Sequence, residues 1–220
     1  MKDEKPENFL KNFKKFTLKI VITDYYRLFK ESKVFKTKWE KAYILQRKEE
    51  DEIFKGYKKT LREDIRRAKK NNLIFRELSE KDLKNFYDIY LFTFRKIRAK
   101  PLPFSFIENL YKKLKNSNLS NFYGVFKDDK LFSALIVLYP DEKTVLAFIQ
   151  GTSGEGYHLN ASPFLFHNAI LYEFKKGREI FSFGAVPEKK ESLIFFKERF
   201  GAEEYSYPVY LWYNPWYVED

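Results

Sequence analysis

Three apolar segments separated by turn-forming residues constrain the fold of this chain most strongly. They lie in NFYGVFKDDKLFSALIVLYPDEKTVLAFIQGTS, residues 121–153, and are rich in β-branched and aromatic residues, which favour strands. Asp128-Asp129 and Pro140-Asp141 stand between them and are typical of tight turns. Consecutive strands joined by short turns pair antiparallel. This region therefore predicts a three-stranded antiparallel meander.

Helices and strands alternate after the meander. SPFLFHNAILYEFKKG, residues 162–177, begins with Ser-Pro and ends in glycine, as helices commonly do. Three further elements follow it: a strand at 179–186, a helix at 191–201 and a strand at 204–213. The second half of the chain thus predicts the order β-β-β-α-β-α-β.

The first half contains fewer strand patterns. From Glu49 to Asn72 apolar residues recur at three- and four-residue spacing, which predicts one long helix. Ser79 and Asp82 have the spacing of a capping box, so a helix is expected from Ser79 to about Lys96. The other expected elements are strands at 16–26, 41–46 and 73–78 and a helix at 104–116.

Composition narrows the classes of protein. In 220 residues, 44% are hydrophobic, which suffices for a sizeable core. There is no cysteine, and His158 and His167 are nine residues apart, so we expect neither disulfides nor a metal site. The formal net charge of +11 favours anionic partners such as tRNA, nucleotide-linked substrates or the inner membrane surface. The abundance of lysine and glutamate fits a thermophilic source.

Targeting signals are not evident in the sequence. No apolar run reaches the roughly 18 residues needed to span a bilayer. The N-terminal MKDEKPENFLKNFKK is charged and lacks the apolar region of a secretory signal. We therefore expect a cytoplasmic protein.

Three motifs follow one another along the chain. They are REDIRRAKK at residues 62–70, Ala161-Ser162-Pro163 at a helix start, and Phe183-Gly184 followed by FKERFG at 196–201. In this order they resemble the GCN5-related N-acetyltransferase superfamily, in particular its FemABX and CelD-like acyltransferase branch, whose long helix has the pattern R-x-x-I-R-K-A-x-K. The resemblance covers about residues 41–213. It implies an α+β fold with a mixed central sheet flanked by helices and a short N-terminal two-strand extension.

The sequence departs from this branch at two positions and in length. Ser182 stands where the branch has an acidic residue, and Ala185 where it has a second glycine. Members usually carry two copies of the fold, whereas this chain has room for about one. We therefore expect residues 1–40 to be an N-terminal extension, a remnant of a first copy, and residues 41–220 to be the acyltransferase domain.

Lys197 is the first candidate catalytic residue. Apolar Ile194 and Phe200 flank it at one helical turn, a pattern that also suits a lysine at the edge of a solvated helix face. The resemblance favours a second interpretation, in which its ammonium stabilises negative charge that develops on an acyl carbonyl or phosphate. A backbone donor near Gly184 or in the loop at residues 150–156 is expected to assist it.

The segment QGTSGEGYHLNASP, residues 150–163, is the candidate substrate loop. Glycines and small hydroxyl side chains between a strand and a helix can hold an anion, although an ordinary flexible connection would look similar. The candidate substrate-binding residues are Gln150, Gly151, Thr152, Tyr157, Asn160 and Ser162. His158 is a candidate general base, with a plain surface histidine as the alternative. His167 falls inside the next helix and is expected to be a packing residue.

The long helix predicted at residues 49–72 carries a basic stripe. Its cations are Lys55 and the four candidate phosphate-binding residues Lys59, Arg62, Arg66 and Lys69. Such a stripe is often only a solvated face, but it also suits the phosphates of tRNA or of a nucleotide carrier. DNA is not an expected partner.

Together these features predict an N-acyltransferase. It would transfer an aminoacyl or acyl group from tRNA or CoA to an amine of a cell-envelope or polysaccharide precursor, such as a peptidoglycan precursor. Acetyl-CoA, another acyl-CoA or aminoacyl-tRNA would serve as co-substrate, with no tightly bound cofactor. The alternative is a non-catalytic binding or scaffold protein on a degenerate copy of the fold, which the serine at position 182 favours.

Overall fold

The computed structural model describes residues 5, 19–25, 27–29, 32–187 and 190–214. The chain divides into two compact units, which we consider separately. A central unit comprises Tyr43–Gly184 and Glu191–Glu203, and a terminal unit comprises Met1–Ala42, Ala185–Lys190 and Glu204–Asp220. The domain boundary expected at residue 40, with a remnant of a first copy before it, stays a prediction.

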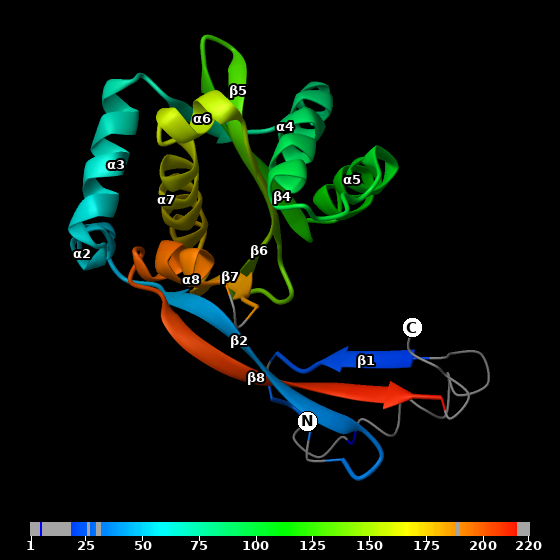
Figure 1. Cartoon of the computed structure of the whole chain (residues 1–220). Helices are drawn as coiled ribbons and strands as arrows, with labels where there is room; N and C mark the ends of the chain where they lie inside the picture. Colours follow the sequence, from blue (N-terminus) through cyan, green and yellow to red (C-terminus); the bar gives the residue numbers. More distant parts are fainter. Residues whose placement is uncertain (1–4, 6–18, 26, 30–31, 188–189, 215–220) are drawn as a thin grey trace. The chain divides into compact units, whose positions relative to one another are not determined.

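The sheet of the central unit contains the predicted meander. Its strands follow the order β7-β6-β5-β4-β3 (Figure 1). They are β3 (Ile74–Glu77), β4 (Ser120–Lys127), β5 (Lys130–Leu138), β6 (Thr144–Thr152) and β7 (Ile180–Ala185). β3 to β6 pair antiparallel with their neighbours and β7 pairs parallel with β6. The mixed sheet expected from the sequence is therefore confirmed.

The turn between β4 and β5 forms where the sequence predicts it. Asp128 and Asp129 have φ angles of 48° and 61°. A two-residue hairpin turn of this kind needs positive φ at both central positions. Aspartate tolerates that conformation better than most residues. The pair of aspartates therefore sets the register of the meander.

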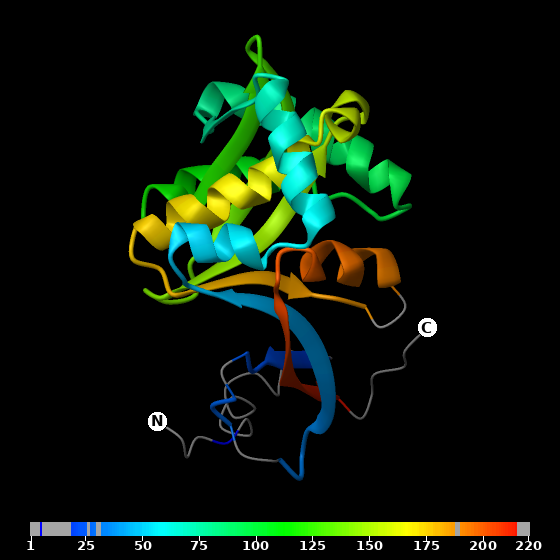
Figure 2. The same ribbon diagram turned by 90° about the vertical axis from the view of Figure 1, so that its left-hand side faces the viewer.

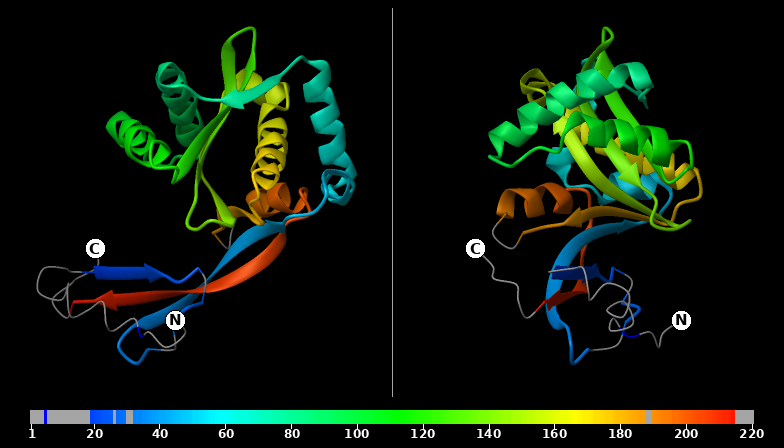
Figure 3. Two further views of the ribbon diagram at one scale, coloured as in Figure 1. Left: turned by 180° about the vertical axis from the view of Figure 1, so that it is seen from behind. Right: turned by 90° about the vertical axis from the view of Figure 1, so that its right-hand side faces the viewer.

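Helices cover both faces of this sheet. α7 (Ala161–Lys175) and α3 (Lys59–Lys70) lie on one face, and α4 (Leu83–Lys96) and α5 (Phe104–Leu110) on the other (Figures 1 and 3). α3 lies outside α7 (Figure 2), so α7 packs between the sheet and another helix. Accordingly α7 buries residues on most of its circumference, whereas α3 buries only Leu61, Ile65 and Ala68. An amphipathic helix is typical of an outer layer.

The capping box predicted at Ser79 is confirmed. Ser79 and Asp82 bond reciprocally and open η1 (Glu80–Asp82), which leads into α4. Arg76 donates to both carboxylate oxygens of Asp82, at 2.8 and 3.1 Å. Mainly through this bond, the pKa of Asp82 is lowered to about 2.

The single long helix predicted over residues 49–72 is wrong. Two helices occur instead, α2 (Glu50–Gly56) and α3, separated by Tyr57 and Lys58. The Lys58 N–H donates to the Arg199 carbonyl at 2.9 Å, and the Tyr57 ring packs against His167 and Phe200. Gly56, a poor helix former, stands at the break. Because the helix breaks there, Lys55 belongs to α2, whereas the four candidate phosphate-binding residues belong to α3.

The remaining elements of the central unit agree with the sequence except near residue 155. α8 (Glu191–Glu198) forms as predicted, and α5 continues into η2 (Tyr111–Lys115). The segment expected to be an open loop at 150–163 is largely ordered backbone. Residues up to Thr152 belong to β6, and a short helix α6 (Gly154–His158) follows. The Ser153 side chain caps α6 by accepting from the Gly156 N–H at 3.0 Å.

The terminal unit is built on strands with an aromatic core. β1 (Lys19–Thr23), β8 (Glu203–Tyr213) and β2 (Lys36–Gln46) follow the order β1-β8-β2. Phe35, Tyr210 and Trp212 form one buried cluster. Residues 16–18 and 26 of the strand predicted at 16–26 lie outside the described residues. Within the described part of the chain, no helix has the length and apolar character needed to cross a bilayer.

Candidate active site

The candidate site lies where β6 and β7 separate. Their parallel ladder begins with Thr144 opposite Ile180 and ends with Leu146 opposite Ser182. β6 then continues to Thr152, paired with β5. The two neighbouring strands therefore share hydrogen bonds only at the beginning of β6, and β7 leaves its neighbour after Ser182.

Gly184 lies just after this point of separation. It has a φ of +73°, and a Cβ atom built on it would be 3.4 Å from the Ala147 carbonyl oxygen. Left-handed backbone of this kind favours glycine. Gly184 therefore lies against the first residue of β6 beyond the shared ladder.

Lys197 is directed at Gly184 from α8. Its side chain is 3% exposed, and its Nζ donates to the Gly184 carbonyl at 2.7 Å. Burial lowers the pKa of the Lys197 ammonium to about 8. Because Lys197 is buried, it does not lie on a solvated helix face, which was the alternative that the sequence pattern also allowed. It places a titratable ammonium beside the separation of β6 and β7.

The backbone donor expected near Gly184 has a partner in the structure. The Gly184 N–H donates to Ser182 Oγ at 3.1 Å. Ser182, where the resembled branch has an acidic residue, is fully buried and supplies a hydroxyl in place of a carboxylate. Two groups were expected to stabilise negative charge, the Gly184 N–H and the Lys197 ammonium. The N–H is already bonded to Ser182, and the ammonium is the one that carries a positive charge.

Three of the candidate substrate-binding residues meet at the other end of β6. The Gln150 side-chain amide donates to Thr152 Oγ1, to Ser133 Oγ at 3.3 Å and to Ser162 Oγ at 3.5 Å. Thr152 and Ser133 are fully buried, and Gln150 is half-buried. This cluster joins β5, β6 and α7, and Gln150 and Ser162 are its half-buried members.

Gly151, another candidate, approaches a helix backbone. A Cβ atom built on it would lie 2.9 Å from the Tyr90 backbone nitrogen and 3.0 Å from the Tyr90 Cα in α4. Real Cβ atoms do not come that close to backbone, so glycine lets α4 pack on β6.

We expect Gly151→Ala to destabilise the protein by about 1–3 kcal/mol, the usual cost of overpacking a core. Chemical denaturation measures this change. Gly56→Ala is the matched control, because a Cβ atom there meets nothing within 4 Å and alanine is the better helix former. Equal stability of the Gly151 variant and the wild type would contradict this role.

The remaining candidates of the loop are dispersed around α6. Tyr157 is 40% exposed, and Asn160 adopts left-handed backbone at the start of α7. His158 lines a hollow of about 530 Å³ together with Lys127, Asp128, Lys130, Phe132, Glu155 and Leu159. Neither Lys197 nor Gly184 lines that hollow. The structure thus places His158 beside the β4–β5 hairpin.

The candidate phosphate-binding residues share α3. Lys59, Arg66 and Lys69 are exposed, and Arg62 donates to the Lys55 carbonyl at 2.8 Å. Their role in phosphate binding stays a prediction. His167, on α7, is a core residue as expected. Burial, assisted by the charge of Lys69, lowers the pKa of His167 to about 4.

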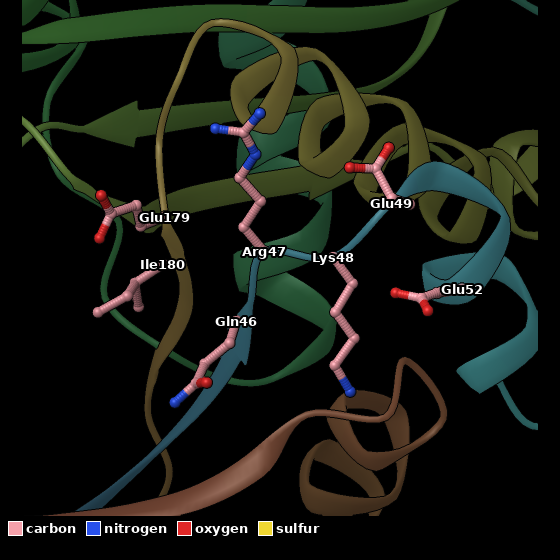
Figure 4. A pocket seen from close by; sticks show the side chains of 7 residues that line it. All are labelled: Gln46, Arg47, Lys48, Glu49, Glu52, Glu179 and Ile180. Carbon is pink, nitrogen blue, oxygen red and sulfur yellow. The ribbon is translucent and has the colours of Figure 1, made fainter.

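A second hollow, of about 670 Å³, was not anticipated from the sequence. It is lined by Gln46, Arg47, Lys48, Glu49, Glu52, Glu179 and Ile180 (Figure 4). Figure 4 shows the Arg47 and Lys48 side chains extending in opposite directions. The run Arg47-Lys48-Glu49, directly after a predicted strand, was the sequence signal that could have pointed to this hollow. It does not differ from an ordinary helix start, where acidic residues are common.

Comparisons with known proteins identify the fold. No family model and no curated protein matches the sequence. The crystal structure of FemX aligns with a TM-score of 0.70 and 14% identity, over 91% of this chain and 68% of FemX. The C-terminal domain of a protein named as a lysylphosphatidylglycerol synthetase from Agrobacterium fabrum aligns with a TM-score of 0.57 and 13% identity, over 81% of this chain and 62% of that one.

A smaller acetyltransferase is covered almost completely by this chain. An acetyltransferase of the GCN5-related family from Staphylococcus aureus aligns with a TM-score of 0.52 and 12% identity, over 64% of this chain and 99% of that one. The chain thus spans about two thirds of FemX and less of the synthetase domain. This chain therefore has the GCN5-related N-acetyltransferase fold, in a form similar to that of FemX.

Proposed function

We propose that this protein is an N-acyltransferase that uses the separation of β6 and β7 as its active site. The observation that carries the proposal is the buried Lys197 ammonium, 2.7 Å from the Gly184 carbonyl. A positive charge in a site of low dielectric stabilises a developing oxyanion far better than the same charge in water. The acyltransferase fold supports this reading of the lysine.

The proposed reaction needs no covalent enzyme intermediate. The nitrogen of an amine attacks the donor carbonyl carbon and forms a C–N bond, and negative charge develops on the carbonyl oxygen near Lys197. The bond from carbon to sulfur or oxygen in the donor then breaks. The leaving thiolate or alkoxide takes up the proton that the attacking amine loses. Holding donor and acceptor together supplies most of the remaining rate enhancement.

We propose a cell-envelope precursor as the source of the amine, and an aminoacyl or acyl group as what is transferred. The likeness to FemX and to a lysylphosphatidylglycerol synthetase supports this choice. The net charge of +11 suits the polyphosphate part of either tRNA or CoA as donor.

Transfer from radiolabelled acetyl-CoA and from a pool of aminoacylated tRNA, each with UDP-N-acetylmuramyl pentapeptide and with free lysine as acceptors, tests the proposal. We expect label in the acceptor amine with one of the donors. If neither donor transfers label to either amine, acyl transfer is refuted. Binding of a precursor in calorimetry would then support the scaffold alternative, which the buried Ser182 also favours.

A further inference from the structure

The connection between α4 and α5 exposes large apolar side chains. It comprises residues 97–103 and lies on the face of the sheet opposite α3 and α7 (Figure 1). Ile97 is 57% exposed and Leu102 is 37% exposed, and Phe106 in the first turn of α5 is 36% exposed. Apolar side chains of this size gain free energy when they leave water. Exposed apolar surface bordered by polar residues often marks a site where a protein or a membrane binds.

The backbone of this connection is bonded to α4. The Leu102 N–H donates to the Tyr90 hydroxyl at 2.7 Å, and the Tyr87 hydroxyl donates to the Leu102 carbonyl at 3.1 Å. The ring of Phe104 packs against that of Tyr87, with the two ring centres 5.3 Å apart. The connection therefore cannot fold inward to bury Leu102 without breaking these contacts.

Basic residues alternate with the exposed apolar ones. Between Asp88 and Glu108 every charged residue is a cation, and all of these cations are exposed: Arg95, Lys96, Arg98 and Lys100. Glu108, the next acidic residue, is itself paired with Lys112 at 2.8 Å. Residues 95–106 thus form a surface that is both apolar and positive, and we call them the amphiphilic segment.

An anionic lipid bilayer fits the amphiphilic segment better than other partners do. A symmetric contact with a second copy of the chain would bring the same cations against one another. The phosphates of a nucleic acid would attract the cations but would leave Ile97 and Leu102 in water. At a bilayer surface the apolar side chains enter the boundary between headgroups and acyl chains, and the long stems of lysine and arginine let their charges stay beside the lipid phosphates.

The basic face of α3 lacks the apolar component. Its exposed cations are Lys59, Arg66, Arg67, Lys69 and Lys70, whereas its apolar residues Leu61, Ile65 and Ala68 are buried. α3 covers the other face of the sheet (Figure 1). It therefore offers charge alone and serves as an internal reference for the amphiphilic segment.

We propose that the amphiphilic segment docks this protein on an anionic bilayer surface, with Ile97, Leu102 and Phe106 entering the lipid interface and the four cations contacting lipid phosphates. This inference goes beyond the proposed function. It is independent of acyl transfer, because it concerns an outer surface and not the reaction centre.

Co-sedimentation of the full chain with lipid vesicles tests the contribution of charge. We expect binding to vesicles of phosphatidylglycerol and phosphatidylcholine in equal parts, and much weaker binding to phosphatidylcholine alone. Replacing Lys96, Arg98 and Lys100 by glutamine should weaken binding by about 100-fold, since each cation near such a surface contributes about fivefold. The charge-matched control replaces Arg67, Lys69 and Lys70 of α3 by glutamine and should weaken binding far less.

A second pair of variants tests the insertion of apolar side chains. Ile97→Ser should weaken binding to the anionic vesicles by about tenfold, the usual factor for burying an apolar side chain of this size. Ile74→Ser is the matched control, because Ile74 on β3 is 61% exposed and lies outside the amphiphilic segment. It should bind like the wild type. Circular dichroism should show that all of these variants are folded.

Four results would overturn the proposal. The first is an absence of wild-type binding to the anionic vesicles. The second is a larger loss from the α3 variant than from the variant of the amphiphilic segment. The third is wild-type affinity of Ile97→Ser, which would show that the apolar side chains do not insert. The fourth is self-association that Ile97→Ser abolishes, without vesicle binding, which would assign the surface to a second copy of the chain.

Discussion

Substituting Lys197 by methionine is expected to lower the rate of acyl transfer by about 100- to 1000-fold, the usual loss when one donor to a developing oxyanion is removed. Methionine preserves the length and apolar stem of lysine but not the charge. The loss should appear in kcat, because charge on the carbonyl oxygen develops only in the transition state. Single-turnover kinetics with the active donor measures it.

The pH dependence of this effect has a definite sign. Burial lowers the pKa of Lys197 to about 8, so its ammonium is charged below that pH and neutral above it. The ratio of wild-type rate to Lys197→Met rate should therefore be largest below pH 8 and decrease as the pH rises further. Taking the ratio removes the titration of the acceptor amine, which both proteins share.

The same substitution should raise stability at neutral pH. The unfolded chain binds the lysine proton up to about pH 10.5, whereas the folded protein releases it near pH 8. Between these values stability rises with pH, and the penalty of roughly 3 kcal/mol is fully present below pH 8. Lys175→Met, at an exposed position, is the control for both activity and stability. Full activity of a folded Lys197→Met variant would refute the role of the ammonium.

Replacing Glu173 by alanine is expected to destabilise the protein by about 3–5 kcal/mol, the cost of breaking a buried ionic cluster. Glu173 is fully buried in α7 and accepts hydrogen bonds from Tyr123 and, at 2.7 Å, from Tyr139. Its second carboxylate oxygen lies 4.0 Å from Arg178 Nε. Without the carboxylate, the buried Tyr123 hydroxyl and the half-buried Tyr139 hydroxyl lose this acceptor, and the Arg178 guanidinium loses a nearby anion. Thermal unfolding should show a decrease in Tm of roughly 10 °C.

Two variants separate the sources of this loss. Tyr139→Phe removes one hydrogen bond and should cost about 1 kcal/mol. Glu173→Gln keeps an acceptor for the tyrosines while removing the charge, so it should fall between the other two. If Glu173→Ala unfolds at the wild-type temperature, the carboxylate does not stabilise the packing of α7 on β4 and β5.

The sequence by itself determined those elements whose causes are local. The Asp128-Asp129 turn follows from the backbone conformations that aspartate tolerates, and the start at Ser79 follows from reciprocal bonds within four residues. The order of strands and helices in the second half also followed from local signals, namely strand-forming residues between turn residues and the Ser-Pro and glycine at the ends of the helix at 162–177. The mixed sheet and its covering helices were expected from the resemblance of the motifs to the acyltransferase branch.

Tertiary structure alone decided where the candidate site formed. The helix predicted across Tyr57 and Lys58 breaks because Lys58 bonds to Arg199, a residue 141 positions later in the chain. The Lys197 pattern fits both a buried and a solvated position, and tertiary contacts, among them that with the Gly184 carbonyl on β7, decide that the ammonium is buried. Contacts between residues so distant in sequence leave no periodic pattern, so they become visible only once the strands are paired.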